Sequence, residues 1–302
     1  MTRPSLFLSA GIGSLYALSD PGRAARVIEL AEAAHIDLLC LGDMPPAGRP
    51  PAFDALVVAS WLAPRAAGVG LIPLVPALAS EPFHVARALS ALDFLTGGRS
   101  GWQPTSGAYD PGRYGTAAGP SGEELLPKAQ DFIAATRSLW DSWDADALII
   151  DTATGVYLDP AKVRPAAYRG PFFQVQGPLN AARPPQGWPV LVQSDADPLW
   201  RRAAADVLLT DRDSVREAGG PLRAGTIHSG SWSTAVIDEI EGRFRAGHFE
   251  GIHITMDDPV TDLGHFTAAA LPELRRRGLL SVAARSATLR SRLMLKVPGE
   301  RR

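Results

Sequence analysis

The sequence predicts a single (β/α)8 barrel, in which a closed ring of eight parallel strands is surrounded by helices. Three observations carry this prediction. Eight short apolar runs alternate with segments of helical periodicity, which is the pattern of repeated strand–helix units. The chain has 302 residues, enough for a barrel that typically needs about 250. Hydrophobic residues make up 46% of the chain and charged residues 21%, so a large core can be buried.

The first half of the chain supplies four of the strands and the helices between them. Residues 22–35, 53–64 and 123–143 have apolar side chains at the three-to-four-residue spacing of an amphipathic helix. Pro82 suits the first turn of another helix, which ends at Gly97. Short apolar runs bounded by Gly, Pro or Asp are typical of strands buried on both faces. The predicted strands are 5–10, 36–42, 68–75 and 99–103.

The second half is less regular. Residues 145–180 combine short β-like pieces with prolines, so we expect an excursion from the barrel within one domain that covers 1–302. The remaining strands are predicted at 189–193, 206–209, 222–227 and 251–255, and the late helices at 231–246 and 260–277. Connections 194–205 and 210–221 leave room only for short helices. We expect the Arg-rich tail, 278–302, to pack across the barrel or against a partner.

The composition narrows the classes of partner and compartment. A net charge of −2 gives no basis for binding nucleic acid or a membrane surface. No apolar stretch reaches about 18 residues, and the N-terminal apolar run is too short for a signal peptide, so we expect a cytoplasmic protein. The single Cys40 excludes an internal disulfide and lies in the apolar run IDLLCLGD, which predicts a packing role. No His, Cys or Asp cluster has metal-ligand spacing, so no metal is expected.

Candidate site residues stand where the predicted strands end, because the chemistry of such barrels collects at the carboxyl ends of the strands. Asp43 follows the second strand and is read as a site residue, the alternative being a cap in the Pro-rich loop that follows. His228 ends the seventh strand and is the best candidate for a general acid or base. Tyr109, Arg113 and Tyr114 follow the fourth strand and are expected to line a substrate pocket.

Residues 81–106, EPFHVARALSALDFLTGGRSGWQPTS, combine a helix, a Gly-Gly turn, a strand and a polar Gln/Thr/Ser end. This block resembles the signature of the luciferase-like flavin monooxygenases, in the branch that contains the nitrilotriacetate, dibenzothiophene-sulfone and long-chain alkane monooxygenases. The similarity continues in SLWDSWDADALIIDTATGVYLDPAKV, in GPFFQVQGPLNAARPPQGWPVLVQ and in LPELRRRGLL. It therefore extends over nearly the whole chain.

The resemblance implies a barrel that uses O2 and reduced FMN, delivered by a separate flavin reductase, to oxygenate a small organic substrate. It implies that Asp43 and Gln103 lie beside the flavin ring, and that Thr105 and Ser106 lie near the ribityl chain and phosphate. Ser194 belongs to the same set of residues that arrange the flavin. Members of this family often form dimers, so a homodimer is one expected assembly.

The sequence departs from the family pattern where the phosphate is expected. The usual Gln-Ala-Gly-x-Ser turn is replaced by residues 193–197, QSDAD, which place Asp195 and Asp197 there. A phosphate needs N–H donors, hydroxyls or cations, and each carboxylate opposes it by about 1 kcal/mol at about 4 Å in water. Leu126 stands where the family has a tyrosine. The long insertion after the seventh strand is also missing. This predicts a more open mouth of the barrel, at the carboxyl ends of its strands.

These departures leave other functions open. The chain could be a relative that has lost flavin binding and acts as a cofactor-free enzyme, or as a non-catalytic binding or scaffold subunit. A third alternative is a deazaflavin user, because some luciferase-like barrels employ that cofactor. Titration with FMN separates a flavin-binding enzyme from a cofactor-free relative.

Overall fold

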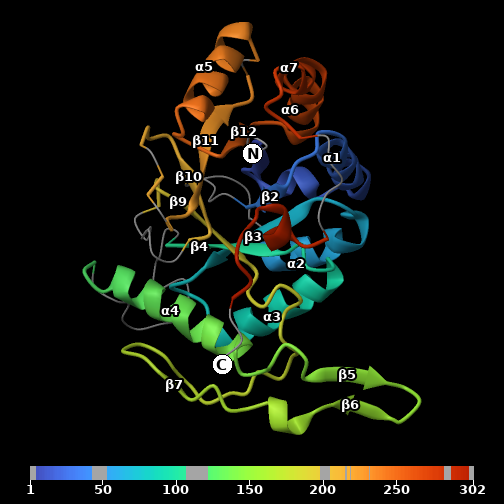
Figure 1. Ribbon diagram of the computed structural model, residues 1–302, viewed down its shortest axis with the longest axis vertical. Helices are drawn as coiled ribbons and strands as arrows, with labels where there is room; N and C mark the ends of the chain where they lie inside the picture. Colours follow the sequence, from blue (N-terminus) through green and yellow to red (C-terminus); the bar gives the residue numbers. More distant parts are fainter. Residues whose placement is uncertain are drawn as a thin grey trace.

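Eight parallel strands close into a barrel in the order β1-β12-β11-β10-β9-β4-β3-β2 (Figure 1). The structure is a computed structural model that describes residues 5–42, 53–106, 122–197, 205–214, 216–217, 219–230, 232–281 and 287–298. The strands are β1 Phe7–Ile12, β2 Leu38–Leu41, β3 Gly70–Pro76, β4 Gly101–Thr105, β9 Val190–Ser194, β10 Val207–Thr210, β11 Leu222–His228 and β12 Gly251–Met256. The predicted fold is confirmed, and each predicted strand overlaps an observed one.

Apolar side chains fill the inside of the barrel toward the amino ends of its strands. Phe7, Leu38, Ile72 and Val192 belong to one buried cluster, together with Cys40. Burial of Cys40 in this cluster agrees with the packing role predicted for it. The fit is tight, because a Cβ atom added at Gly251 would lie 2.6 Å from the ring of Phe7.

The helices pack around the barrel and mostly begin at residues that cap them. The bounds are α1 Pro21–Ala33, α2 Ala55–Leu62, α3 Pro82–Leu95, α4 Leu125–Trp140, α5 Thr234–Arg245, α6 Pro259–His265 and α7 Leu271–Arg276. The side chains of Asp20, Asp54, Ser233 and Asp258 each accept a hydrogen bond from a backbone N–H in the first turn that follows. The helix predicted over 260–277 is formed by α6 and α7, joined through a five-residue π-helical segment, Phe266–Ala270.

The irregular excursion lies between α4 and β9, as predicted. It contains two small hairpins, β5 Leu148–Asp151 with β6 Val156–Leu158, and β7 Tyr168–Arg169 with β8 Gln174–Val175. In Figure 1 the β5–β6 hairpin projects from the lower side of the molecule. Asp131 of α4 holds the second hairpin, because its carboxylate accepts the N–H groups of Phe172 and Phe173 at 2.8 Å and also the hydroxyl of Tyr168.

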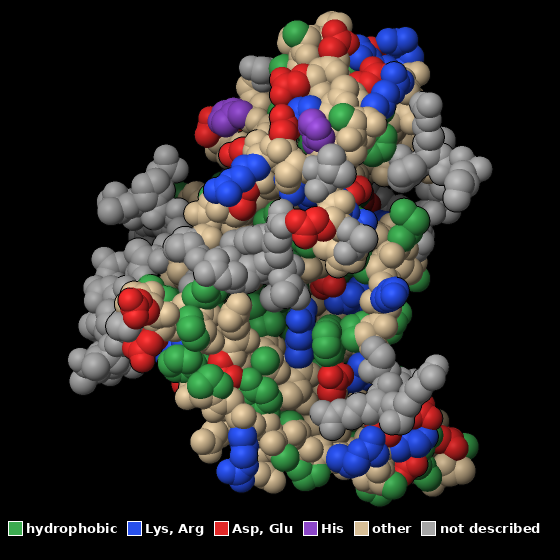
Figure 2. All heavy atoms as spheres, turned by 60° about the vertical axis from the view of Figure 1, so that its left-hand side comes forward, with side chains coloured by type: hydrophobic (Ala, Val, Ile, Leu, Met, Phe, Trp, Pro, Cys, Tyr) green, Lys and Arg blue, Asp and Glu red, His purple; other side chains and the backbone are tan. Residues whose placement is uncertain are grey.

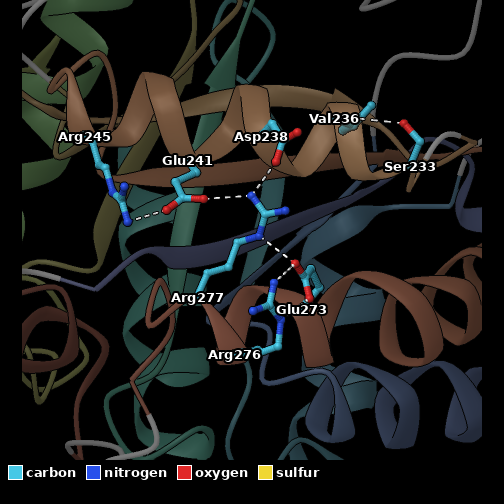
Figure 3. A network of polar contacts seen from close by, with 8 residues as sticks. All are labelled: Ser233, Val236, Asp238, Glu241, Arg245, Glu273, Arg276 and Arg277. Atoms are coloured by element: carbon cyan, nitrogen blue, oxygen red, sulfur yellow. Dashed lines mark hydrogen bonds and ion pairs between the residues drawn. The ribbon is translucent and has the colours of Figure 1, made fainter.

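An ion-pair network holds α5 against α7 (Figure 3). The guanidinium of Arg277 lies 2.6 Å from Asp238 and 2.7 Å from both Glu241 and Glu273. Only five residues separate the end of β11 from the start of α5, so the predicted trimming of the insertion is confirmed. A short connection therefore precedes α5, and the ion pairs of Arg277 hold this helix in place.

The tail packs across the amino end of the barrel, which is the first of the two expected placements. Its short helix, α8 Leu289–Arg292, contributes Leu289 to the cluster inside the barrel, and Leu293 follows it there. The Arg290 side chain is only 3% exposed, and its Nη2 atom lies 2.7 Å from Asp206 Oδ2. Its Nε and Nη1 atoms donate to backbone carbonyl oxygens at 2.6 and 3.0 Å. The tail is thus anchored by a buried, hydrogen-bonded cation.

We expect Arg290→Met to lower the free energy of unfolding by about 3 kcal/mol, because it leaves the carboxylate of Asp206 without its charge partner in a mostly buried place. Urea denaturation at pH 7 measures the change. Arg276→Met is the matched control, since the Arg276 side chain is 70% exposed and an exposed pair is worth about 0–1 kcal/mol. Equal losses in the two variants would contradict this account of the tail.

Candidate functional site

Neighbouring strands bring the predicted hydroxyl and amide residues to one part of the barrel rim. β4 and β9 are adjacent in the barrel, and both run toward the same end. Gln103 and Thr105 lie in the last three residues of β4, Ser106 follows, and Ser194 is the last residue of β9. Gln103 is 8% exposed and Thr105 is 4% exposed, so both are held by the surrounding protein. The sequence predicted this grouping.

The carboxylate of Asp197 binds the end of β4. Its Oδ2 atom accepts the Thr105 hydroxyl at 2.5 Å and the Ser106 N–H at 3.0 Å. Its Oδ1 atom accepts the Ser106 hydroxyl at 3.0 Å. Hydrogen bonds to an ionised acceptor are stronger than bonds between neutral groups. One side chain of the protein therefore collects three donors that an anionic ligand could otherwise use.

A compact turn presents this carboxylate. The N–H of Asp197 donates to the carbonyl of Ser194 at 3.1 Å, and the N–H of Ala196 lies 3.3 Å from the Ser194 hydroxyl. Asp195, in the middle of the turn, accepts the hydroxyl of Thr210, and Arg212 Nε lies 3.7 Å from its Oδ2 atom. Two carboxylates thus stand within three residues at the end of β9.

The phosphate group of FMN does not fit the described residues at this part of the rim. A phosphate is bound by N–H groups, hydroxyls and cations. Here the two hydroxyls and the N–H at the end of β4 already donate to Asp197. A second anion would have to displace that carboxylate, and it would then face Asp195 on the same turn.

A buried polar pair lies deeper in the barrel. His253 of β12 and Ser9 of β1 are 4% and 0% exposed, and the Nδ1 and Oγ atoms are 2.8 Å apart. The Cys40 Sγ atom lies 3.8 Å from the same hydroxyl. Burial lowers the pKa of His253 to about 4, and Asp211 opposes this shift. The imidazole is therefore neutral at pH 7 and serves the barrel as a hydrogen-bonding group.

The remaining predicted site residues lie elsewhere or outside the described part of the chain. His228 ends β11, as predicted, with a side chain that is 63% exposed and an Nε2 atom 3.6 Å from Asp257 Oδ2. β9 and β10 separate this strand from β4. Its role as general acid or base stays a prediction. Asp43, together with the substrate-pocket residues Tyr109, Arg113 and Tyr114, lies outside the described residues.

The surface carries side chains of both charges. On the face in Figure 2, acidic and basic side chains are interspersed, in keeping with the net charge of −2. Among the described residues, no group of three or more His, Cys, Asp or Glu side chains is arranged to hold a metal ion. In that same part of the chain, no helix is long and apolar enough to cross a membrane.

Residues 2–210 match the luciferase-like monooxygenase family. The chain belongs to this family. It is 39% identical to dibenzothiophene-sulfone monooxygenase from Rhodococcus erythropolis over 155 residues, which are 51% of this chain and 34% of that protein. It is 35% identical to one of the two pristinamycin IIA synthase subunits from Streptomyces pristinaespiralis over 190 residues, which are 63% of this chain and 62% of that one.

Another relative is N-acetyl-S-(2-succino)cysteine monooxygenase from Bacillus subtilis (strain 168), 34% identical over 175 residues, or 55% of this chain and 39% of that protein. The luciferase-like chain therefore aligns with less than half the length of the two relatives named as monooxygenases. Among solved structures, long-chain alkane monooxygenase (LadA) superposes with a TM-score of 0.86 at 18% identity, covering 97% of this chain and 96% of that one. This likeness shows the shared fold.

Sequence reasoning placed Thr105, Ser106 and Ser194 at strand ends but missed the contact that Asp197 makes there. It expected Asp195 and Asp197 to repel a phosphate, and it did not predict that Asp197 binds Thr105 and Ser106. A signal was present, because an acceptor at one strand end and a Thr-Ser pair at another would meet if the two strands were neighbours. Strand order in the barrel supplies the missing information.

We expect His253 to make the protein less stable in acid. Because burial lowers its native pKa to about 4, below the unfolded value, its contribution is complete above pH 6.5 and is lost as the pH falls toward 4. Between pH 7 and pH 5 this loss is about 2 kcal/mol. Urea denaturation at the two pH values should show a smaller loss in His253→Gln. The exposed His84 gives the control variant His84→Gln, and a wild-type loss equal to that of His253→Gln would contradict the assignment.

Proposed function

We propose that this protein takes part in the flavin-dependent oxygenation of a small organic substrate, with O2 and reduced flavin supplied by a separate reductase. The observation that carries the proposal is the grouping of Gln103, Thr105 and Ser106 at the carboxyl end of β4, within a luciferase-like barrel. Nitrilotriacetate monooxygenase component A from Aminobacter aminovorans, 30% identical over 154 residues, is named as one component of a larger system. That name supports a separate reductase.

Each rim residue has a role that its chemistry suits. The amide of Gln103 offers both donors and an acceptor to the edge of a heteroaromatic ring such as that of a flavin. Asp43 is proposed to lie beside the same ring. His228 is exposed and could carry a proton to or from a substrate at the mouth. We propose that Tyr109, Arg113 and Tyr114, which follow β4 in the sequence, line the substrate pocket.

A second candidate function is favoured by the bond between Asp197 and the end of β4. If that carboxylate excludes flavin, the chain would serve as a cofactor-free or non-catalytic subunit. Both pristinamycin IIA synthase subunits are similar to this chain, one at 31% identity over 147 residues and the other at 35% over 190. The partner of such a subunit would be another luciferase-like chain. A homodimer is the corresponding assembly if the protein acts alone.

Flavin titration decides between the two candidates. The purified protein is titrated with riboflavin and FMN, each oxidised and, under anaerobic conditions, reduced. The first candidate predicts that at least one of the four forms binds with a micromolar Kd. Failure of all four at millimolar concentration would contradict it. The second candidate would then predict a stable complex with a longer luciferase-like chain, measured by size-exclusion chromatography with light scattering.

A further inference from the structure

The end of β4 carries three hydrogen-bond donors that the protein satisfies with its own carboxylate. Thr105 Oγ1 and the N–H of Ser106 both donate to Asp197 Oδ2, at 2.5 and 3.0 Å, and Ser106 Oγ lies 3.0 Å from Oδ1. Both carboxylate oxygens are engaged, and these three donors come from two consecutive residues. Thr105 is only 4% exposed, so the end of β4 is enclosed by the surrounding protein. A ligand phosphate would need the same donors.

A carboxylate at this place changes which ligands are favoured. An ionised carboxylate accepts hydrogen bonds and donates none. It therefore pairs with hydroxyl groups of a ligand, and it repels a phosphate. The same chemistry separates two classes of dinucleotide site, in which an acidic residue binds a free ribose hydroxyl and an arginine accommodates a phosphate at that position. Carboxylates at the place where a ligand phosphate would lie thus indicate a ligand that ends in a hydroxyl.

Asp195 strengthens this preference. Its side chain is 17% exposed, and it stands two residues before Asp197 on the same turn. It accepts the Thr210 hydroxyl, so it is fixed to the neighbouring strand β10, and the described cation near it, Arg212, lies 3.7 Å away with a side chain that is 80% exposed. Even if Asp197 moved aside, a phosphate bound to Thr105 and Ser106 would approach an acidic turn. The arrangement opposes a phosphate with two carboxylates, whereas a carboxylate is a suitable acceptor for the hydroxyl of a polyol.

We infer that the mouth selects a flavin without a phosphate group, of the riboflavin type, over FMN. Riboflavin carries a primary hydroxyl where FMN carries its phosphate, and that hydroxyl can donate to the carboxylate of Asp197 or Asp195. The inference rests on the proposed function, because it requires that a flavin occupies the mouth. It names the ligand class of that site, which neither the family match nor the barrel fold specifies.

Competing titrations of riboflavin and FMN test the inference. Flavin fluorescence and equilibrium dialysis are measured in a phosphate-free buffer at pH 7.5, with the full chain. The wild type should bind riboflavin about tenfold or more tightly than FMN. Asp197→Asn keeps the shape of the side chain and removes its charge, so FMN affinity should rise about tenfold, and riboflavin affinity should fall because a neutral amide oxygen is a weaker acceptor for its hydroxyl. Asp197→Ser, which restores a hydroxyl, should shift the preference in the same direction.

Asp146→Asn is the matched control, because it removes one negative charge from a side chain that is 74% exposed in the excursion. It should leave both affinities unchanged. Wild-type protein that binds FMN as tightly as riboflavin would overturn the inference and leave the flavin-dependent function standing. If neither flavin binds to the wild type or to either Asp197 variant, the inference and the proposed function both fail. The wild-type comparison decides even if a variant does not fold.

Discussion

The buried carboxylate of Asp93 is the interaction on which the barrel and its rim depend. It lies near the end of α3 and accepts hydrogen bonds from the backbone N–H and side chain of both Ser100, at 3.2 and 2.8 Å, and Gln186, at 3.1 and 2.7 Å. Burial raises its pKa, and these four bonds oppose the rise. Gln186 Oε1 also accepts the Arg290 N–H at 2.9 Å. One carboxylate therefore fixes the start of β4, the segment before β9 and the tail.

The opposite end of β4 shows what this rigidity does for the site. Because the strand is fixed at its start, the Thr105 and Ser106 donors at its far end have a defined position. In this protein those donors meet the carboxylate of Asp197 from the neighbouring strand end. The barrel of the luciferase-like family is thus retained, while the donors at the end of β4 are satisfied from within the protein. This arrangement is the basis for the two proposals, a site for a phosphate-free flavin and a cofactor-free subunit.

The elements that sequence reasoning predicted are those encoded by local pattern. β2 was predictable because its apolar run and the flanking polar residues are contiguous, and α3 because Pro82 and Gly97 mark its ends. The contacts that decide function are non-local. Asp93 and Gln186 are 93 residues apart in the sequence, and Thr105 and Asp197 are 92 apart. Such pairs meet only through the strand order and stagger of the closed barrel, which a single sequence does not display.

A crystal structure of the purified protein, grown without flavin in millimolar inorganic phosphate, tests the central claim most directly. We expect the Asp197 carboxylate to lie within hydrogen-bond distance of the Thr105 hydroxyl and the Ser106 N–H, with no phosphate on that turn. The same experiment on Asp197→Ser should place a phosphate there. A phosphate bound to Thr105 and Ser106 in the wild type, with Asp197 turned away, would contradict the account.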